Sequence, residues 1–236
     1  MVGRTAGRTA LCLIAFCTAT VSHGQTVVGP DSAPGKYNRL RDISVRPATA
    51  LTPARPDVFG TAAVGAGVTF YDARFRRVSQ ADRDHPKILA MAAKLEGMTP
   101  EQKLAAVQAM VLKEVRWSHD LENMRVADFW SNAAETLERG TGDSEDIAIV
   151  QMQVLKAAGF DPRDLYISIG RHRRAGSHVV LLARTPSGFV SLDDRVGQPM
   201  AASSVAQFTP VMTIGYGKSW IHGRRVGGIA SRAGAR

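Results

Sequence analysis

The chain has 236 residues and a formal net charge of +9, with 30 basic side chains against 21 acidic ones. Its only two cysteines, Cys12 and Cys17, lie in an N-terminal segment that we expect to be removed. The mature protein then contains no cysteine, which excludes disulfide bonds and catalysis by a thiol.

The first 24 residues have the features of a secretory signal peptide. Two arginines precede an apolar run over residues 10–21, and the small residues Ser22 and Gly24 follow. The apolar run is too short for a membrane-spanning helix. We therefore expect cleavage after Gly24, with Ala19 as the alternative, and a mature protein that is periplasmic or secreted and does not span a membrane.

Beyond this signal, the composition indicates an arm, one domain and a tail. Residues 25–56 are rich in Pro, Ala, Arg and Thr without a sustained apolar period, which predicts a linker or arm. Residues 57–222 are long enough for one domain with its own core. Residues 223–236 are dominated by Gly, Ala and Arg, and we expect a basic disordered tail there.

The first clear helix of the domain is predicted to begin at Pro100. Thr99 can cap this helix, and Gln102 can complete a capping box. Apolar side chains then recur at helical spacing at Leu104, Val107, Val111 and Val115. The acidic stretch after Trp117 is expected to be a loop.

A second helix and three strands follow in the C-terminal half of the domain. The helix is predicted over residues 144–158, with Gly159 ending it. Short β-branched segments at 165–169, 178–184 and 188–194 then predict strands, the last two joined by a tight turn at Pro186 and Ser187. Helices followed by an antiparallel sheet are an α+β arrangement.

Ser144 lies in the first turn of the second predicted helix, after a Gly-rich segment. Unpaired backbone N–H groups and the positive end of the helix dipole would surround its side chain. A thiolate would be stabilised there, whereas a serine hydroxyl stays protonated and needs a base. The plainer interpretation is an ordinary capped first turn, with Asp143 as the N-cap.

The predicted hairpin would bring His178, near the start of one strand, beside Asp193 and Asp194 at the end of the next. Which aspartate faces the histidine depends on whether the loop holds two or three residues, because a one-residue slip reverses the side chains. A nucleophile, a histidine and an orienting carboxylate would form a catalytic triad. An edge histidine and turn-forming aspartates are the non-catalytic alternative.

The segment DFWSNAAETLERGTGDSEDIA, residues 128–148, resembles the bacterial transglutaminase-like cysteine proteinases. Their signature has an aromatic residue and Trp, a Glu-Leu segment, and then Gly-Asp-Cys-Glu-Asp opening a helix. A later His-aliphatic-Leu strand and a Leu-Asp strand end also belong to it. The matching positions are Phe129, Trp130, Glu135, Leu137, 142–146, 178–181 and Leu192 with Asp193.

The resemblance implies a papain-like or transglutaminase-like core. It places Ser144 where the family has its nucleophilic cysteine, His178 as the general base and Asp193 as the residue that orients it. The family includes periplasmic proteases that release biofilm adhesins, in which acidic residues beside the cysteine bind calcium. The matching residues are Asp143, Glu145 and Asp146, whose carboxylates suit Ca²⁺ and equally suit helix capping.

Three functions are compatible with these patterns. The first is a catalytically impaired protease that still binds a protein or peptide, such as a surface adhesin segment. The second is an active Ser-His-Asp peptidase. The third is a polyanion-binding envelope protein that uses the arginine clusters at 76–77, 171–174 and 224–225. Export argues against nucleic acid as a partner.

Overall fold

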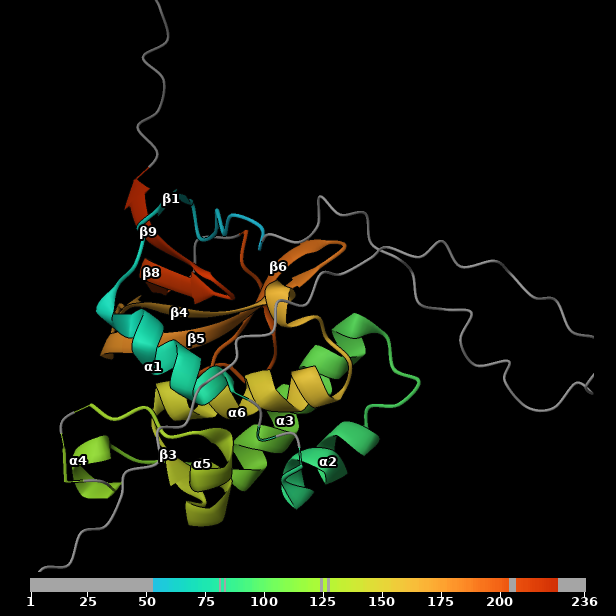
Figure 1. Ribbon diagram of the computed structural model, residues 1–236. Helices are drawn as coiled ribbons and strands as arrows, with labels where there is room; N and C mark the ends of the chain where they lie inside the picture. The colour runs from blue at the N-terminus through green and yellow to red at the C-terminus, as the bar shows by residue number, and fades with distance from the viewer. Residues whose placement is uncertain are drawn as a thin grey trace, which may run out of the picture. The chain divides into compact units, whose positions relative to one another are not determined.

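The computed structural model describes residues 53–80, 82, 84–123, 125–126, 128–203 and 207–224. These residues form a seven-stranded antiparallel sheet in the order β1-β9-β8-β4-β5-β6-β7, with helices packed along one side (Figure 1). No helix within these ranges is long and apolar enough to cross a membrane. The expected signal peptide, most of the arm and most of the tail lie outside the described residues.

The α-helices are α1 (Phe70–Ser79), α2 (Pro86–Ala93), α3 (Pro100–Glu114), α4 (Asp120–Asn123), α5 (Ala133–Arg139) and α6 (Ser144–Ala157). A 3₁₀ turn, η2, spans Pro162–Asp164. The strands of the large sheet are β1 (Thr61–Gly65), β4 (Leu165–His172), β5 (Gly176–Thr185), β6 (Gly188–Leu192), β7 (Met200–Ala201), β8 (Phe208–Gly215) and β9 (Lys218–Arg224). Two short strands, β2 (Arg116–Trp117) and β3 (Thr141–Gly142), pair in parallel.

The two helices predicted from the sequence are confirmed as α3 and α6. Thr99 and Gln102 form the expected capping box around Pro100. Three of the four predicted apolar positions lie in α3 and the fourth, Val115, is its C-cap, and each is at most 2% exposed. Helix α6 is buried along most of its length, and it ends where Gly159 adopts a positive φ of 91°. This burial makes α6 the central helix of the fold and holds its N-terminal turn in place.

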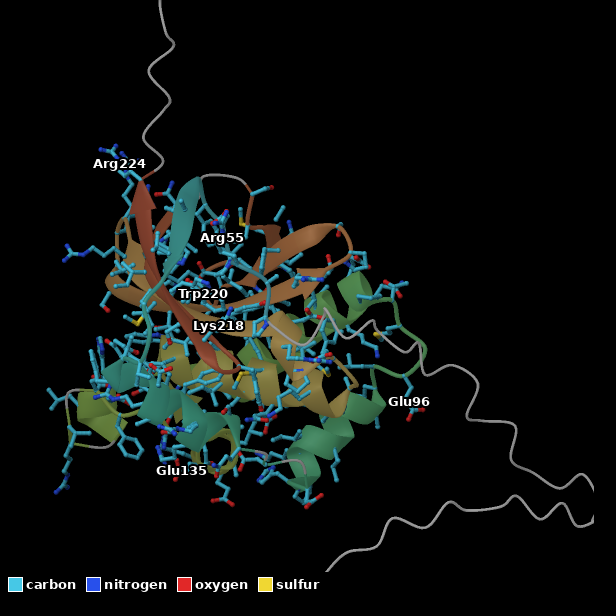
Figure 2. The ribbon with its side chains drawn as sticks, turned by 45° about the horizontal axis from the view of Figure 1, so that its top comes forward. Arg55, Glu96, Glu135, Lys218, Trp220 and Arg224 are labelled. Atoms are coloured by element: carbon cyan, nitrogen blue, oxygen red, sulfur yellow. The ribbon has the colours of Figure 1, made fainter. Side chains whose placement is uncertain are left out.

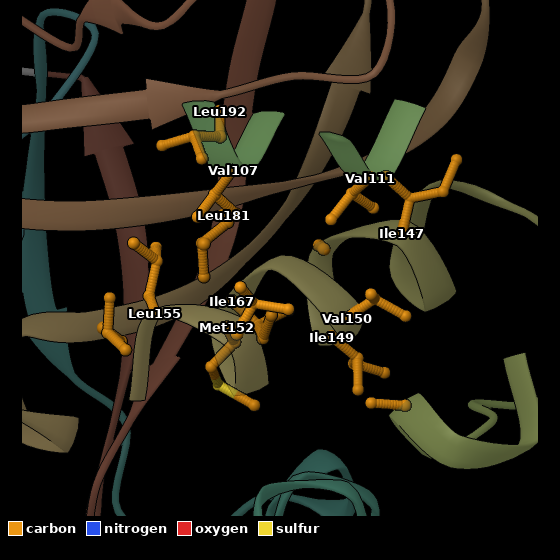
Figure 3. Close-up of a cluster of buried hydrophobic side chains, with 14 of the residues drawn as sticks. Val107, Val111, Ile147, Ile149, Val150, Met152, Leu155, Ile167, Leu181 and Leu192 are labelled. Carbon is orange, nitrogen blue, oxygen red and sulfur yellow. The ribbon is translucent and has the colours of Figure 1, made fainter. Parts of the chain in front are cut away.

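The core lies on both faces of the large sheet, because alternate residues of each strand point to opposite sides. On the helix side, Ile167, Leu181 and Leu192 pack with residues of α3 and α6 (Figure 3). On the other side, Tyr166 and Leu182 pack with Phe59, from the segment before β1. Helices and N-terminal segment thus enclose the sheet that carries His178.

The order of helices before the large sheet is confirmed apart from β1, which was not predicted, and the short strands β2 and β3 lie between helices. The expectation of a loop after Trp117 was incomplete, because the short helix α4 lies within that stretch. Strand β1 precedes all helices and pairs with β9, with Thr61 opposite Arg224. Figure 2 labels Lys218, Trp220 and Arg224 along β9. This strand therefore continues through Gly223 and Arg224, the first two residues assigned to the tail, because β1 supplies their backbone partners.

The loop of the β5–β6 hairpin holds two residues, and this length fixes how the two strands pair. Thr185 pairs with Gly188, and Leu181 pairs with Leu192. Pro186 and Ser187 form the turn, as the sequence predicted. The register places Asp193 and Asp194 directly after β6, at the end of the hairpin where His178 lies.

Candidate active site

Ser144 is the first residue of α6, and the backbone before it is held tightly. Asp143 caps the helix by accepting a hydrogen bond from Asp146 N at 3.4 Å. At Gly142, a Cβ atom would lie 2.7 Å from the Asp146 Cβ, so only glycine fits there without displacing Asp146. The predicted cap is confirmed, and it fixes where the Ser144 side chain begins.

The Ser144 hydroxyl has two hydrogen-bond partners. Its Oγ accepts a bond from Val179 N at 3.2 Å and donates to Glu145 Oε2 at 3.3 Å. Within the described residues, Ser144 Oγ forms no hydrogen bond with the ring of His178. The structure thus brings Ser144 to the strand that carries His178 and points its proton toward a carboxylate.

His178 lies in β5 and is only 2% exposed. Its Nε2 forms a hydrogen bond with Asp193 Oδ1 at 2.9 Å and lies 3.3 Å from Asp194 Oδ1. The ring also meets Phe208 edge-on, with centroids 6.0 Å apart. The sequence left open which aspartate faces His178. In the structure both aspartates face Nε2, and of the two only Asp193 forms a hydrogen bond with it.

The two aspartates differ in their ionisation. Burial opposes ionisation of Asp193, but hydrogen bonds from His178 and from Arg195 N outweigh it and lower the pKa of the carboxyl. Burial raises the pKa of Asp194 to about 6, and the negative charge of Asp193 adds to the shift while His178 opposes it. Asp193 is thus the carboxylate that stays charged beside the ring.

Ser144 and His178 both line a cleft of about 530 Å³. One wall is aromatic, with Tyr71 stacked on Trp130 at 5.7 Å between ring centroids. Arg195 also lines the cleft, and its guanidinium lies over the Trp117 ring at 5.9 Å. A cleft with aromatic walls and a few polar groups suits a peptide side chain.

Five carboxylates gather at the start of α6. Asp143, Glu145 and Asp146 were predicted from the sequence, and the structure adds Asp120 from α4 and Asp128. Oxygens of Asp120, Asp128 and Glu145 lie within 4.8 Å of one another, as do those of Asp120, Asp143 and Asp146. The acidic stretch after Trp117 was the available signal, but the sequence did not show where this loop folds.

Four of these carboxyl groups, those of Asp120, Asp143, Glu145 and Asp146, have raised pKa values, chiefly because they are buried. Burial, reinforced by neighbouring acidic groups, raises the pKa of Asp143 to about 9 and that of Asp146 to about 7. Burial also raises the pKa of Glu145 and of Asp120. A cation placed among them would offset both burial and mutual repulsion.

Not all five carboxylates are equally available to a cation. Asp146 accepts a hydrogen bond from Ser131 N at 2.8 Å and another from Arg139 at 2.8 Å, so both oxygens have partners. Asp120 accepts a bond from Phe129 N with one oxygen, while its Oδ1 is buried without a hydrogen-bond partner. The unpartnered oxygen fits a calcium ligand, and Asp146 fits a structural role.

Comparison with known families identifies the chain. The model of the bacterial transglutaminase-like cysteine proteinases matches residues 73–209, which is more than half of the sequence. The chain belongs to this family. The expected transglutaminase-like α+β core is thereby confirmed. Ser144, His178 and the carboxylate cluster all lie inside the part of the chain that matches the family.

Solved structures of LapG from Legionella pneumophila are similar to this member of the family. An EGTA-treated form is 21% identical with a TM-score of 0.51, and the match covers 66% of this chain and 87% of that one. A calcium-bound form is also 21% identical with a TM-score of 0.51, covering 65% and 88%. At this identity the likeness shows a shared fold. Comparison with curated proteins gave no match.

Proposed function

We propose that this protein is an exported, catalytically impaired member of its family, which binds a peptide segment in the cleft between α6 and β5. Ser144 occupies the nucleophile position, His178 the position of the base, and Asp193 orients His178. The main support for the proposal is one hydrogen bond: the Ser144 hydroxyl donates to Glu145 and not to His178. A surface adhesin of the producing cell is the expected source of the peptide.

The physical reason lies in how cysteine sites work. They use a thiolate paired with an imidazolium, and the thiolate needs no further proton transfer before it attacks. A serine must lose its proton to a base during attack, so it needs a hydrogen bond to that base. One contact of Ser144 suits a thiolate, because Val179 N donates to Oγ, whereas the carboxylate of Glu145 does not. Neither contact prepares a hydroxyl for deprotonation.

An active Ser-His-Asp peptidase is the second candidate. The 2.9 Å hydrogen bond between His178 and Asp193 favours it, since an orienting carboxylate has a purpose when the ring acts as a base. The polyanion-binding hypothesis has less support. One of its residues, Arg77, is engaged within the fold with the Trp130 carbonyl, the Phe129 ring and Glu135.

Calcium is the proposed cation of the carboxylate cluster. Three observations support it: oxygen atoms within 4.8 Å of one another, the unpartnered Asp120 Oδ1, and a solved LapG structure in a calcium-bound form. Asp143, Glu145, Asp120 and Asp128 would supply the hard oxygen ligands that Ca²⁺ requires. Asp146, although named from the sequence, would hold the helix start through Arg139 and Ser131.

A labelling and binding experiment separates the two candidates. The purified mature protein is treated with a fluorophosphonate probe, and its binding to a peptide library is measured in parallel. Peptide binding without labelling of Ser144 supports the impaired protease. Labelling of Ser144 together with peptide hydrolysis would show an active serine peptidase, and neither binding nor labelling would refute both. Intact-mass measurement of the exported protein should show a chain that begins at Gln25.

A further inference from the structure

A buried histidine and two buried carboxylates converge at one end of the β5–β6 hairpin. His178 Nε2, one oxygen of Asp193 and one oxygen of Asp194 lie within 4.8 Å of one another. The side chain of Asp194 is 5% exposed, and it lies 3.3 Å from Nε2. Its Oδ1 has no hydrogen-bond partner in the described part of the chain. Orientation of the ring by Asp193 gives no reason for this second carboxylate.

Burying two carboxylates beside one histidine costs free energy unless a further positive charge lies among them. A buried carboxylate oxygen without a donor loses its hydration and gains nothing in return. The second carboxylate beside it adds repulsion, and the single ring nitrogen that faces both can donate only one proton. A divalent cation would satisfy both oxygens at once.

The distances match a tetrahedral metal site. Zinc binds imidazole nitrogen and carboxylate oxygen at about 2.0–2.2 Å, so adjacent ligand atoms of a tetrahedron are roughly 3.3–3.6 Å apart. Nε2 is 2.9 Å from the Asp193 oxygen and 3.3 Å from the Asp194 oxygen, and the ligand atoms of the two aspartates lie within 4.8 Å of each other. Three protein ligands leave a fourth position for water, and a cavity of about 600 Å³ lined by Asp193 gives access.

We propose that His178 Nε2, Asp193 Oδ1 and Asp194 Oδ1 form a binding site for a divalent transition-metal ion of the zinc type. An imidazole with two carboxylates favours such an ion over calcium, which prefers oxygen ligands alone. The site is separate from the carboxylate cluster at the start of α6, because the two share no residue.

Metal binding has a defined chemical consequence for His178. In a neutral ring that has its proton on Nε2, the ion takes that position and the proton moves to Nδ1 by exchange with solvent. The metal-bound ring then has no free nitrogen that could accept a proton from residue 144. If the proposed role of His178 as a base is correct, Zn²⁺ therefore inhibits hydrolysis by locking this ring.

Calorimetric titration of the tag-free mature protein with ZnCl₂, in saturating Ca²⁺, tests the ligand set. One Zn²⁺ should bind per chain, and Asp194→Asn should lower the affinity by more than about tenfold, the least expected for a lost ligand. Two matched controls should bind Zn²⁺ as the parent does. His172→Asn keeps an acceptor for the turn amides beside the site, and Asp143→Asn alters the other cluster. Unchanged affinity in Asp194→Asn, or a loss in His172→Asn, would overturn the proposal.

NMR of the ring nitrogens tests the same site without a substitution. Zn²⁺ should shift the Nε2 signal of His178 and replace its attached proton, so that the ring proton is found on Nδ1. Shifts confined to other histidines would refute the site. Neither measurement uses catalysis, so a failure of the proposed peptidase function would leave the result on the metal site readable.

Discussion

Ser144→Cys should create or greatly increase peptidase activity, because the proposed base and its orienting carboxylate are already paired, with His178 Nε2 2.9 Å from Asp193 Oδ1. Val179 N would donate to the sulfur, as it now does to Ser144 Oγ at 3.2 Å. A helix start and a neighbouring imidazolium lower a cysteine pKa from about 8.5 to between roughly 3.5 and 7.5. The upper limit of the gain is about 10⁶-fold, which is the cost of removing a triad member in a working enzyme.

The charge of Glu145, the residue next to position 144, decides how large the increase in activity will be. Ser144 Oγ is 3.3 Å from Glu145 Oε2. At an effective dielectric constant of about 20, an ionised Glu145 at that distance would oppose a thiolate by about 5 kcal/mol, or 3–4 pKa units. This is as large as the stabilisation from the helix and the imidazolium. We therefore expect the cysteine variant to need calcium at the carboxylate cluster, with up to about a 10³-fold difference in rate.

Two measurements would check the variant. The first is hydrolysis of a peptide library by the parent and by Ser144→Cys, each with and without Ca²⁺. The second is the pH dependence of alkylation by iodoacetamide, which reports the thiol pKa without any substrate. A thiol pKa above 8.5 in saturating Ca²⁺ would refute the reasoning about stabilisation. Turnover by the parent, but not by the variant, would show that the site is built for serine.

Three further predictions follow from the same contacts. Without calcium, the melting temperature should fall as pH rises from about 4 to about 9. In the folded state the pKa values of Asp143 (about 9) and Asp146 (about 7) exceed the ordinary value of 3.8. The folded state therefore binds more protons than the unfolded state in this pH range, and it loses stability as they are released. Calcium should raise the melting temperature more at pH 8 than at pH 6, and no shift at millimolar Ca²⁺ would leave these residues as helix caps. In the cysteine variant, Asp193→Asn should lower activity on the order of 10⁴-fold, because an amide no longer stabilises the charged ring and can favour the wrong tautomer of His178. A larger loss for Asp194→Asn would show that Asp194 orients the ring. Gly142→Ala should destabilise the fold by about 1–3 kcal/mol, because its Cβ would meet Asp146 at 2.7 Å. Thermal or urea unfolding should show no comparable loss for Gly65→Ala, whose Cβ would meet nothing within 4 Å.

The sequence by itself determined the features that depend on neighbouring residues. The caps at Thr99 and Asp143 act within four residues of the helices that they begin. The tight turn at Pro186 and Ser187 was likewise predicted from local turn chemistry, whereas the loop length that sets the register came from the structure. The family signature likewise lies mostly in one continuous segment, so the order of the amino acids is enough to recognise it.

The tertiary structure decided the contacts between distant parts of the chain. Strand β1 finds its partner in β9, more than 150 residues away, and nothing in its five residues indicates that pairing. Asp120 and Asp128 lie beside the carboxylates at the start of α6, although both precede this helix in the sequence. The direction of the Ser144 hydroxyl and the approach of both Asp193 and Asp194 to one ring nitrogen depend on how α6 and the hairpin pack together. Such packing is set by the summed contacts of the whole core, which local sequence patterns do not encode.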